Sequence, residues 1–220
     1  MLKQLKNDID TILRRDPAAR SRLEVFLCYP GLRALYAYRR AHKHYIKGHY
    51  LYARLISQRA RHRTGIEIHP GARIGQGFFV DHGSGVVIGE TAVIGDNVTL
   101  YQGVTLGGTG KDAGKRHPDI GDSVTIGAGA KVLGPITIGD YSKVGAGSIV
   151  LKDVPPHCTV VGNPGSIVEK NRSFTVWEVD LDHANLPDPV LEKMDHMMMR
   201  ISVLEAKLAV KERGISHEDL

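Results

Sequence analysis

The chain has 220 residues, enough for one domain with appendages or for two small domains. Aromatic residues make up only 6% of it, which argues against a core built on large rings, whereas glycine is abundant at 25 residues. The two cysteines, Cys28 and Cys158, are too few for a disulfide scaffold and have no metal-ligand spacing. There is no signal-peptide-like apolar run and no stretch of about 18 apolar residues, so we expect a cytoplasmic protein.

Glycine content and charge divide the chain at the same places. Between Gly65 and Gly165 lie 22 of the 25 glycines. Residues 1–64 contain 15 Lys and Arg against 4 Asp and Glu, so the net charge of +5 comes from this segment. Its cations alternate with aliphatic residues and tyrosines, which favours a solvated helical surface or an acidic partner over nucleic acid or a membrane. We predict three parts, with boundaries at 1–64, 65–168 and 169–220.

The first part has a helical pattern. Ile9, Ile12 and Leu13 share one stripe, and the run from Leu32 to Ile56 places Leu, Ala and Tyr among Arg and Lys. Asp16-Pro17 is typical of a helix N-cap followed by proline at the first helical position. We expect three or four helices, packed against one end of the central part.

The central part is a six-residue repeat. A period of six fits neither a helix nor simple strand alternation. It fits a chain that runs straight, turns and repeats, so that three hexads of about 18 residues complete one coil of a triangular parallel β-helix. A two-residue slip follows the third hexad. The repeated aliphatic positions are Ile68, Ile74, Val80, Ile88, Ile94, Leu100, Leu106, Ile120, Ile126, Val132, Ile138, Val144 and Val150.

Three further features lie beyond or between the hexads. Residues 107–119 are polar and glycine-rich, and we expect them to loop out. The segment from Val161 to Gly165 predicts the turn that ends the coils, followed by irregular polar chain to about Pro189. After it, a heptad stripe predicts a helix that packs on its own domain or forms a short coiled coil between subunits. The stripe is Val190, Met194, Met197, Ile201, Leu204 and Leu208.

Several stretches together resemble the serine O-acetyltransferase family. They are Ile66-Glu-Ile-His-Pro70, Val80-Asp-His-Gly-Ser-Gly85 with Gly89-Glu-Thr91, Gly107-Gly-Thr-Gly-Lys111 with Lys115-Arg-His-Pro118, and Ile126-Gly-Ala-Gly-Ala-Lys131. The resemblance covers about Asp16 to Val168. It implies a mainly β solenoid: a left-handed parallel β-helix as the catalytic domain at 65–168, an N-terminal α-helical cap and oligomerisation domain, and a C-terminal helix.

The implied reaction transfers the acetyl group of acetyl-CoA to the hydroxyl of L-serine, the first step of cysteine biosynthesis, without a metal. By resemblance His82 is the general base, and a histidine suits that role because its unperturbed pKa is about 6.5. Glu67 is the carboxylate that would orient it.

The resemblance also assigns the binding groups. Asp16 and Asp81 would hold the serine ammonium, and Arg116 with His117 would hold its carboxylate and hydroxyl, since a guanidinium fork matches a carboxylate. The positions that match coenzyme A contacts are Gly108, Thr109, Ala128, Lys131, Lys143 and Ala146.

The resemblance further implies a homotrimer or a dimer of trimers, with active sites between neighbouring prisms, and feedback inhibition by L-cysteine in the serine site. Relatives that dock into O-acetylserine sulfhydrylase end in isoleucine. This chain ends in Glu218-Asp219-Leu220, which argues against that partner.

Three alternatives stay open from the residues. A hexapeptide acetyltransferase could act on a sugar or a xenobiotic, although residues 107–119 suit an amino acid. A metal-dependent hydratase could gather His69, His82 and His117, but proline follows two of them. The third alternative is a trimeric scaffold without catalytic activity.

Overall fold

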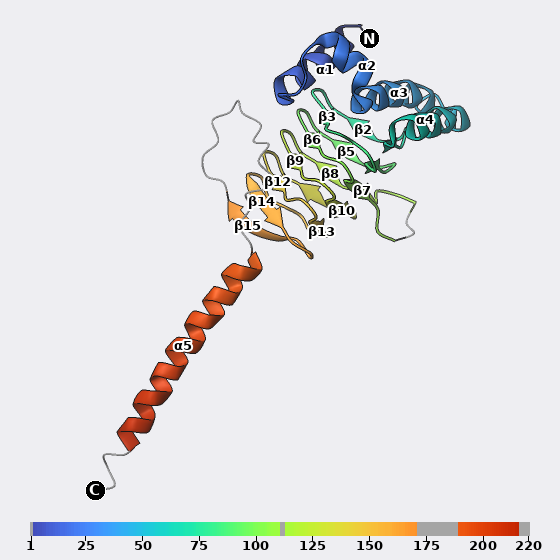
Figure 1. The fold of residues 1–220 in the computed structure, drawn as a ribbon. Helices are drawn as coiled ribbons and strands as arrows, with labels where there is room; N and C mark the ends of the chain where they lie inside the picture. Colours follow the sequence, from blue (N-terminus) through green and yellow to red (C-terminus); the bar gives the residue numbers. More distant parts are fainter. Residues whose placement is uncertain (1, 111–112, 171–188, 216–220) are drawn as a thin grey trace. The chain divides into compact units, whose positions relative to one another are not determined.

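The computed structural model describes residues 2–110, 113–170 and 189–215 (Figure 1). They belong to two compact units, one within Met1–Leu186 and the other within Pro187–Leu220. None of the helices in these ranges is both long and apolar enough to cross a membrane. Both cysteines are free thiols, with Cys28 exposed and Cys158 buried.

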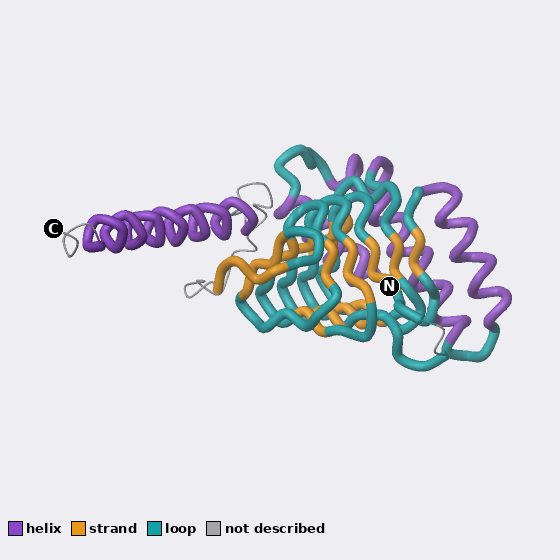
Figure 2. Tube along the Cα trace, turned by 90° about the horizontal axis from the view of Figure 1, so that it is seen from below, coloured by secondary structure: helices purple, strands orange, loops and turns teal. Residues whose placement is uncertain are grey.

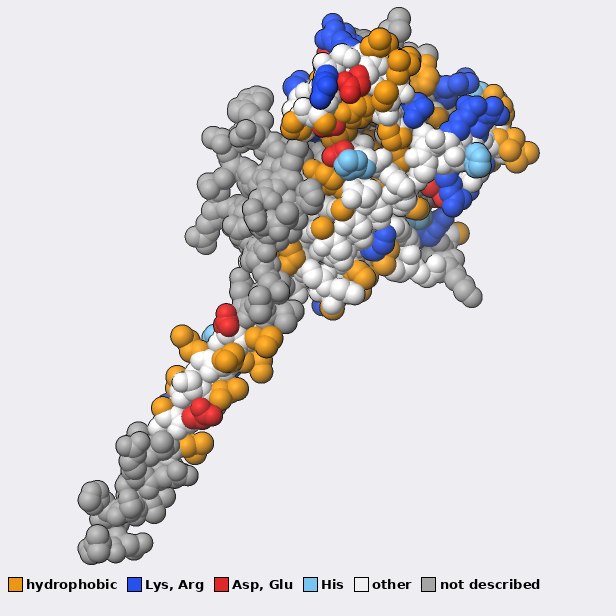
Figure 3. All heavy atoms as spheres, viewed as in Figure 1, with side chains coloured by type: hydrophobic (Ala, Val, Ile, Leu, Met, Phe, Trp, Pro, Cys, Tyr) orange, Lys and Arg blue, Asp and Glu red, His pale blue; other side chains and the backbone are white. Residues whose placement is uncertain are grey.

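The N-terminal part forms four helices, which confirms the expected number: α1 (Leu2–Arg15), α2 (Arg22–Cys28), α3 (Pro30–Tyr45) and α4 (Tyr50–Thr64). Lys and Arg side chains gather over these helices (Figure 3). The predicted helix start at Asp16-Pro17 is wrong. Helix α2 begins at Arg22 with Ser21 as its N-cap, while Asp16 accepts the Ala18 N–H at 2.8 Å in the turn before it, a local bond that aspartate makes equally well outside helices.

The repeat produces thirteen short strands, each containing one of the thirteen predicted aliphatic positions. They are β1 (Glu67–Ile68), β2 (Arg73–Ile74), β3 (Phe79–Val80), β4 (Val87–Ile88), β5 (Val93–Ile94), β6 (Thr99–Leu100), β7 (Thr105–Gly107), β8 (Asp119–Ile120), β9 (Thr125–Ile126), β10 (Lys131–Leu133), β11 (Thr137–Ile138), β12 (Lys143–Val144) and β13 (Ile149–Val150). The hexad prediction is therefore confirmed. Residues 108–110 and 113–118, the described part of the predicted 107–119 loop, lie between β7 and β8 outside the strands, whereas Gly107 and Asp119 belong to those strands.

The strands stack into three parallel sheets, which form the faces of a triangular prism (Figure 2). Face A has the order β1-β4-β7-β10-β13, face B has β11-β8-β5-β2, and face C contains β12-β9-β6-β3. Ile88 pairs with Leu106, and Leu106 with Val132, so each inward aliphatic residue stacks on its equivalent in the next coil. Their side chains are fully buried and form the core.

Helices α3 and α4 cover the first coil. A Cβ placed on Gly31 of α3 would lie 2.4 Å from the carbonyl oxygen of Val80, so this helix approaches the backbone of the coil directly. Tyr38 donates a hydrogen bond to the Ala72 carbonyl at 2.7 Å, and Ser57 donates one to the Ile68 carbonyl at 2.8 Å. These bonds satisfy carbonyls that the first coil would otherwise leave without a neighbouring coil.

A β-hairpin of β14 (Cys158–Val161) and β15 (Ser166–Lys170) caps the other end of the β-helix. Strand β14 continues face C, and β15 pairs antiparallel with it. The turn predicted at 161–165 is present, but the irregular chain expected directly after it is wrong for residues 166–170. A strand forms there because the turn returns the chain along the exposed edge of the sheet. The rest of that predicted segment, to residue 188, lies outside the described residues.

Helix α5 (Pro189–Ile215) confirms the predicted C-terminal helix. The heptad side chains that the structure describes are exposed in the single chain: Met194, Met197, Ile201, Leu204 and Leu208. Figure 3 shows hydrophobic side chains along this helix.

A leucine in the stack should contribute far more stability than one beside it. Leu100 is fully buried, whereas Leu151, next to the stacked Val150, is 49% exposed. We expect Leu100→Ala to lower the free energy of unfolding by about 2–5 kcal/mol. Leu151→Ala should change it by less than about 1 kcal/mol. Urea denaturation at one fixed protein concentration measures both, and equal effects would contradict the stacked-core description.

Candidate active site

The predicted site residues lie along the two edges of face A. At the edge between faces C and A, here named the C–A edge, the chain turns at residues 81–86, 101–104, 127–130 and 145–148. At the edge between faces A and B, the A–B edge, it turns at residues 69–72, 89–92 and 134–136, and the described loop residues 108–110 and 113–118 begin and end there.

His82 lies on the C–A edge, in the turn that the two-residue slip enlarges. Its backbone has a φ of 55°, in the left-handed region, which costs a residue other than glycine about 1 kcal/mol. The His82 side chain is 74% exposed, and its Nε2 lies 3.9 Å from Oδ1 of Asp81. The imidazole is thus held away from the prism, where a second molecule can reach it.

Glu67 has a different partner in the single chain from the one predicted. Its carboxylate Oε2 lies 3.2 Å from Nε of Arg61 on α4. The carboxylate at ion-pair distance from His82 is that of Asp81. The orienting role of Glu67 stays a prediction.

Asp16 and Asp81 come together around two tyrosines. Tyr29 donates its hydroxyl to Oδ2 of Asp16 at 2.5 Å. Burial, this bond and the charges of Asp16, Glu24 and Asp81 raise the pKa of the Tyr29 phenol. Burial and the charges of Asp81 and Asp16 likewise raise the pKa of Tyr101. Both carboxylates act on the same two phenols, and a pair of neighbouring carboxylates suits an ammonium group.

Neither tyrosine was selected from the sequence, although Tyr101 has a recognisable signal. Later coils have glycine after the stacked aliphatic residue at the C–A edge, as in Ile126-Gly127. Asp81 and Tyr101 replace that glycine in the first two coils. Departures from the repeat therefore mark this cluster.

Beyond His82, the C–A edge includes the turns at residues 127–130 and 145–148, where small residues leave the backbone open. These two turns are named the backbone strip. Ala128 and Ala146 lie on it, and the Gly147 N–H donates to the Ala128 carbonyl at 2.8 Å. A Cβ on Gly129 or Gly147 would meet no atom within 4 Å. Beside the strip, Lys131 of face A donates its Nζ to the Gly103 carbonyl, and Lys143 lies in β12 of face C. Four of the six predicted coenzyme A positions thus lie on or beside one edge.

The other predicted residues cluster at the A–B edge. A Cβ on Gly108 would lie 3.1 Å from the Arg116 carbonyl oxygen, and one on Gly134 would lie 3.2 Å from Oγ1 of Thr109. His117 is buried, and its Nδ1 accepts the Thr91 N–H at 3.2 Å. Burial and the charge of Arg116 lower the pKa of His117.

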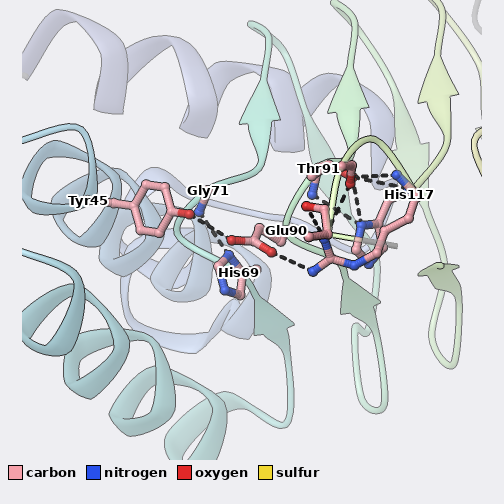
Figure 4. A network of polar contacts seen from close by, with 9 residues as sticks. Tyr45, His69, Gly71, Glu90, Thr91 and His117 are labelled. Atoms are coloured by element: carbon pink, nitrogen blue, oxygen red, sulfur yellow. Dashed lines mark hydrogen bonds and ion pairs between the residues drawn. The ribbon is translucent and has the colours of Figure 1, made fainter. Parts of the chain in front are cut away.

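Glu90 and Tyr45, which the sequence reasoning missed, complete this cluster. Glu90 Oε2 lies 2.5 Å from Nη2 of Arg116, and Tyr45 donates its hydroxyl to Glu90 Oε1 at 2.7 Å (Figure 4). Thr91 Oγ1 accepts the backbone N–H groups of Arg116 and His117, both at 3.1 Å. The turn at residues 89–92 thereby holds the end of the long loop.

Within one chain, face A separates the two clusters. Asp16, Asp81 and His82 lie at the C–A edge, whereas Arg116 and His117 lie at the A–B edge. His69 is also on the A–B edge, so the three histidines considered for a metal are divided between the edges. Across the described part of the chain, no group of three or more His, Cys, Asp or Glu side chains is arranged to hold a metal ion.

Comparison with known proteins agrees with this architecture. A family model described as "Bacterial transferase hexapeptide (six repeats)" matches residues 117–152. A serine acetyltransferase from Bacillus subtilis (strain 168) is 55% identical over 216 residues, which are 98% of this chain and 99% of that relative.

Two solved serine acetyltransferases also match, each at 45% identity. One, from Brucella abortus strain S19, is in complex with coenzyme A, and the match has a TM-score of 0.75 and covers 77% of this chain and 68% of that one. The other, from Neisseria gonorrhoeae, is in complex with serine, with a TM-score of 0.74 and coverage of 76% and 69%.

The three stacked sheets and the match to the family model together place the chain in the hexapeptide-repeat class of transferases. The expected fold class, a left-handed parallel β-helix with N-terminal helices and a C-terminal helix, is confirmed. The chain belongs to the serine acetyltransferase family.

Two histidines of the A–B edge, the buried His117 and the half-buried His69, should make stability depend on pH. Burial lowers the pKa of His117 and of His69, so near pH 6.5 the unfolded chain binds protons that the native chain does not. The stability that the two neutral histidines contribute is fully present above their unfolded pKa of about 6.5. It is lost as the pH falls toward their lower pKa values in the native chain.

We therefore expect the free energy of unfolding to fall between about pH 7.5 and pH 5.5, and to fall less steeply in His117→Gln. Urea denaturation across this range measures the slope, with His62→Gln, at an exposed position, as the matched control. An unchanged slope in His117→Gln would show that this imidazole does not titrate differently on folding.

Proposed function

We propose that this protein transfers the acetyl group of acetyl-CoA to the hydroxyl of L-serine and releases O-acetyl-L-serine and CoA, the first step of cysteine biosynthesis. The observation that carries the proposal is the C–A edge, where an exposed His82 stands between a two-carboxylate cluster and an open backbone strip. The cluster suits the ammonium of an amino acid, and the strip suits an extended acyl carrier. Relatives solved with serine and with coenzyme A support this assignment.

In the proposed reaction, Asp16 and Asp81 hold the serine ammonium while Arg116 and His117 bind its carboxylate and hydroxyl. His82 takes the hydroxyl proton as the serine oxygen attacks the thioester carbonyl. A backbone N–H stabilises the tetrahedral oxyanion. Collapse of the intermediate breaks the carbon–sulfur bond and expels the CoA thiolate, which takes the proton back from the imidazolium.

The pantetheine arm of acetyl-CoA would lie along the C–A edge. Small residues at Ala128 and Ala146 leave backbone groups open to it, and Lys131 or Lys143 would meet its phosphates. Gly108 and Thr109, on the A–B edge of a neighbouring copy of the chain, would contact it from the other side. In this proposal the side chains of the site act only in acid–base catalysis and in substrate binding.

Loss of the base should abolish most of the activity. We expect His82→Ala to release CoA from acetyl-CoA about 10²–10⁴-fold more slowly than wild type with L-serine as acceptor. His62→Ala, at an exposed position on α4, is the control and should match wild type. Rates of His82→Ala within about tenfold of wild type would remove His82 from the mechanism.

The same assay and a metal analysis of the purified protein separate the remaining alternatives. Maltose and chloramphenicol replace serine as acceptors, and turnover with either of them but not with serine would identify a sugar or xenobiotic acetyltransferase. Stoichiometric zinc in the purified protein would favour the hydratase. Absence of turnover with all three acceptors would favour a scaffold.

We further propose that each active site forms between two copies of the chain in a homotrimer. One prism would supply His82, Asp81 and the backbone strip from its C–A edge, and its neighbour would supply Arg116 and His117 from its A–B edge. Support comes from the separation of these edges by face A, which keeps the two halves apart in a single chain. Three-fold symmetry would repeat this heterologous contact at every interface.

Shared sites predict complementation between inactive variants. His82→Ala and Arg116→Ala should each be nearly inactive alone. Co-expressed with different tags and purified as mixed trimers, they should recover up to about one third of wild-type activity, because one of the three interfaces in every mixed trimer joins two intact edges. Mixed-tag trimers of His82→Ala alone are the control. No recovery would place the whole site within one chain.

Four points stay open for experiment: inhibition by L-cysteine in the serine site, the choice between a trimer and a dimer of trimers, a cytoplasmic location, and whether O-acetylserine sulfhydrylase is a partner. The C-terminal residues on which the last depends, 218–220, lie outside the described residues. The domain boundaries at 64 and 168 are likewise proposals.

A further inference from the structure

A chain of polar groups links the helical cap to Arg116. Tyr45 is the last residue of α3, and its hydroxyl donates to Glu90 Oε1 at 2.7 Å. The other carboxylate oxygen, Oε2, lies 2.5 Å from Nη2 of Arg116. Figure 4 shows Glu90 between the tyrosine and the loop. Both oxygens of this carboxylate are therefore engaged, and from opposite sides.

The Tyr45 bond restricts how the carboxylate can turn. The terminal torsion of a glutamate side chain has only broad preferences, so a bond from arginine alone leaves the carboxylate free to rotate with it. The Tyr45 ring packs edge-on against Tyr50 and His69, with centroid distances of 5.0 and 5.7 Å. A Cβ on Gly71 would lie 3.1 Å from Cζ of the ring. A well-packed phenol thus fixes one end of the chain.

Hydrogen bonds, more than packing, decide where Glu90 points. Tyr45 and Glu90 border a cavity of about 350 Å³, together with Arg73, Thr91 and Lys115. The cavity leaves space on one side of the carboxylate. Removal of the phenol hydroxyl would therefore let Glu90 turn and shift the Nη2 side of the attached guanidinium, whose Nη1 makes only long bonds, at 3.3 and 3.4 Å, to the carbonyls of Ala113 and Gly114.

The protonation states of the chain suit this arrangement at neutral pH. Bonds from Arg116 and then from Tyr45 lower the pKa of Glu90. The bond to Glu90 and burial raise the pKa of Tyr45 to about 12. The phenol is a donor and the carboxylate an acceptor throughout the range in which the enzyme would work.

We propose that Tyr45 is a positioning residue for serine: through Glu90 it fixes the guanidinium of Arg116 in the direction that receives the substrate carboxylate. This role rests on the proposed function, which makes Arg116 the carboxylate ligand. A guanidinium has five N–H donors in a rigid fork, so it can bind Glu90 and a second carboxylate together. Its direction then decides whether the second pair of bonds is well aligned.

Tyr45→Phe tests this role, because it removes one oxygen atom and keeps the packed ring. We expect the KM for serine to rise about 3–10-fold, as for a weakened bond to a charged group, with kcat and the KM for acetyl-CoA within about twofold of wild type. Tyr52→Phe removes the same atom from an exposed tyrosine of α4 and should leave all three constants unchanged.

A double-mutant cycle separates positioning from a structural contribution. Because Tyr45 acts only through Glu90, Tyr45→Phe should add no further change to the serine KM in a Glu90→Ala background. The role of Tyr45 would be overturned by any of three results. The first is that the effects of Tyr45→Phe and Glu90→Ala on the serine KM multiply in the double variant. The others are equal rises of the serine and acetyl-CoA KM values in Tyr45→Phe, or an unchanged serine KM in that variant. An inert wild-type enzyme would instead overturn the proposed function, and with it this role, before any variant is compared.

Discussion

The stacking of one aliphatic side chain per hexad, coil upon coil, is the constraint on which the rest of the molecule depends. Parallel pairing in register places Ile88, Leu106 and Val132 in one buried column on face A. Once that column points inward, the residue before each of its members must point outward, because side chains alternate along a strand. The turns are then confined to three edges, and every site residue on a turn inherits its position from the stack.

The site occupies the places where this regularity is broken. The slip at residues 81–86 enlarges one turn and carries His82, and Tyr101 stands where later coils have glycine. After the longest interruption of the hexads, Arg116 and His117 lie against the turn at residues 89–92. A rigid repeat with few interruptions can therefore hold charged and strained groups that a small irregular fold would have difficulty stabilising.

The sequence predicts features that depend on local order and misses those that depend on distant partners. All thirteen strands follow from the spacing of the hexads, because a periodic pattern constrains each coil in the same way. The helix start at Asp16 failed because aspartate makes the same local bond in a turn. Glu67 is paired with Arg61 of a helix whose orientation no local pattern defines. Tyr45 and Glu90 meet across 45 positions, with no motif to connect them.

The open backbone strip on the C–A edge also defines a length. Successive coils of a parallel sheet are spaced by about 4.8 Å, so the turn at Ala146 lies about 14 Å along the edge from that of His82. An acyl carrier bound along the strip would have its thioester at one end and its phosphates near the other. The distance between these two groups would then equal a whole number of coil spacings. A prism with one coil more or fewer in this interval would present the same catalytic turn to a carrier of different reach.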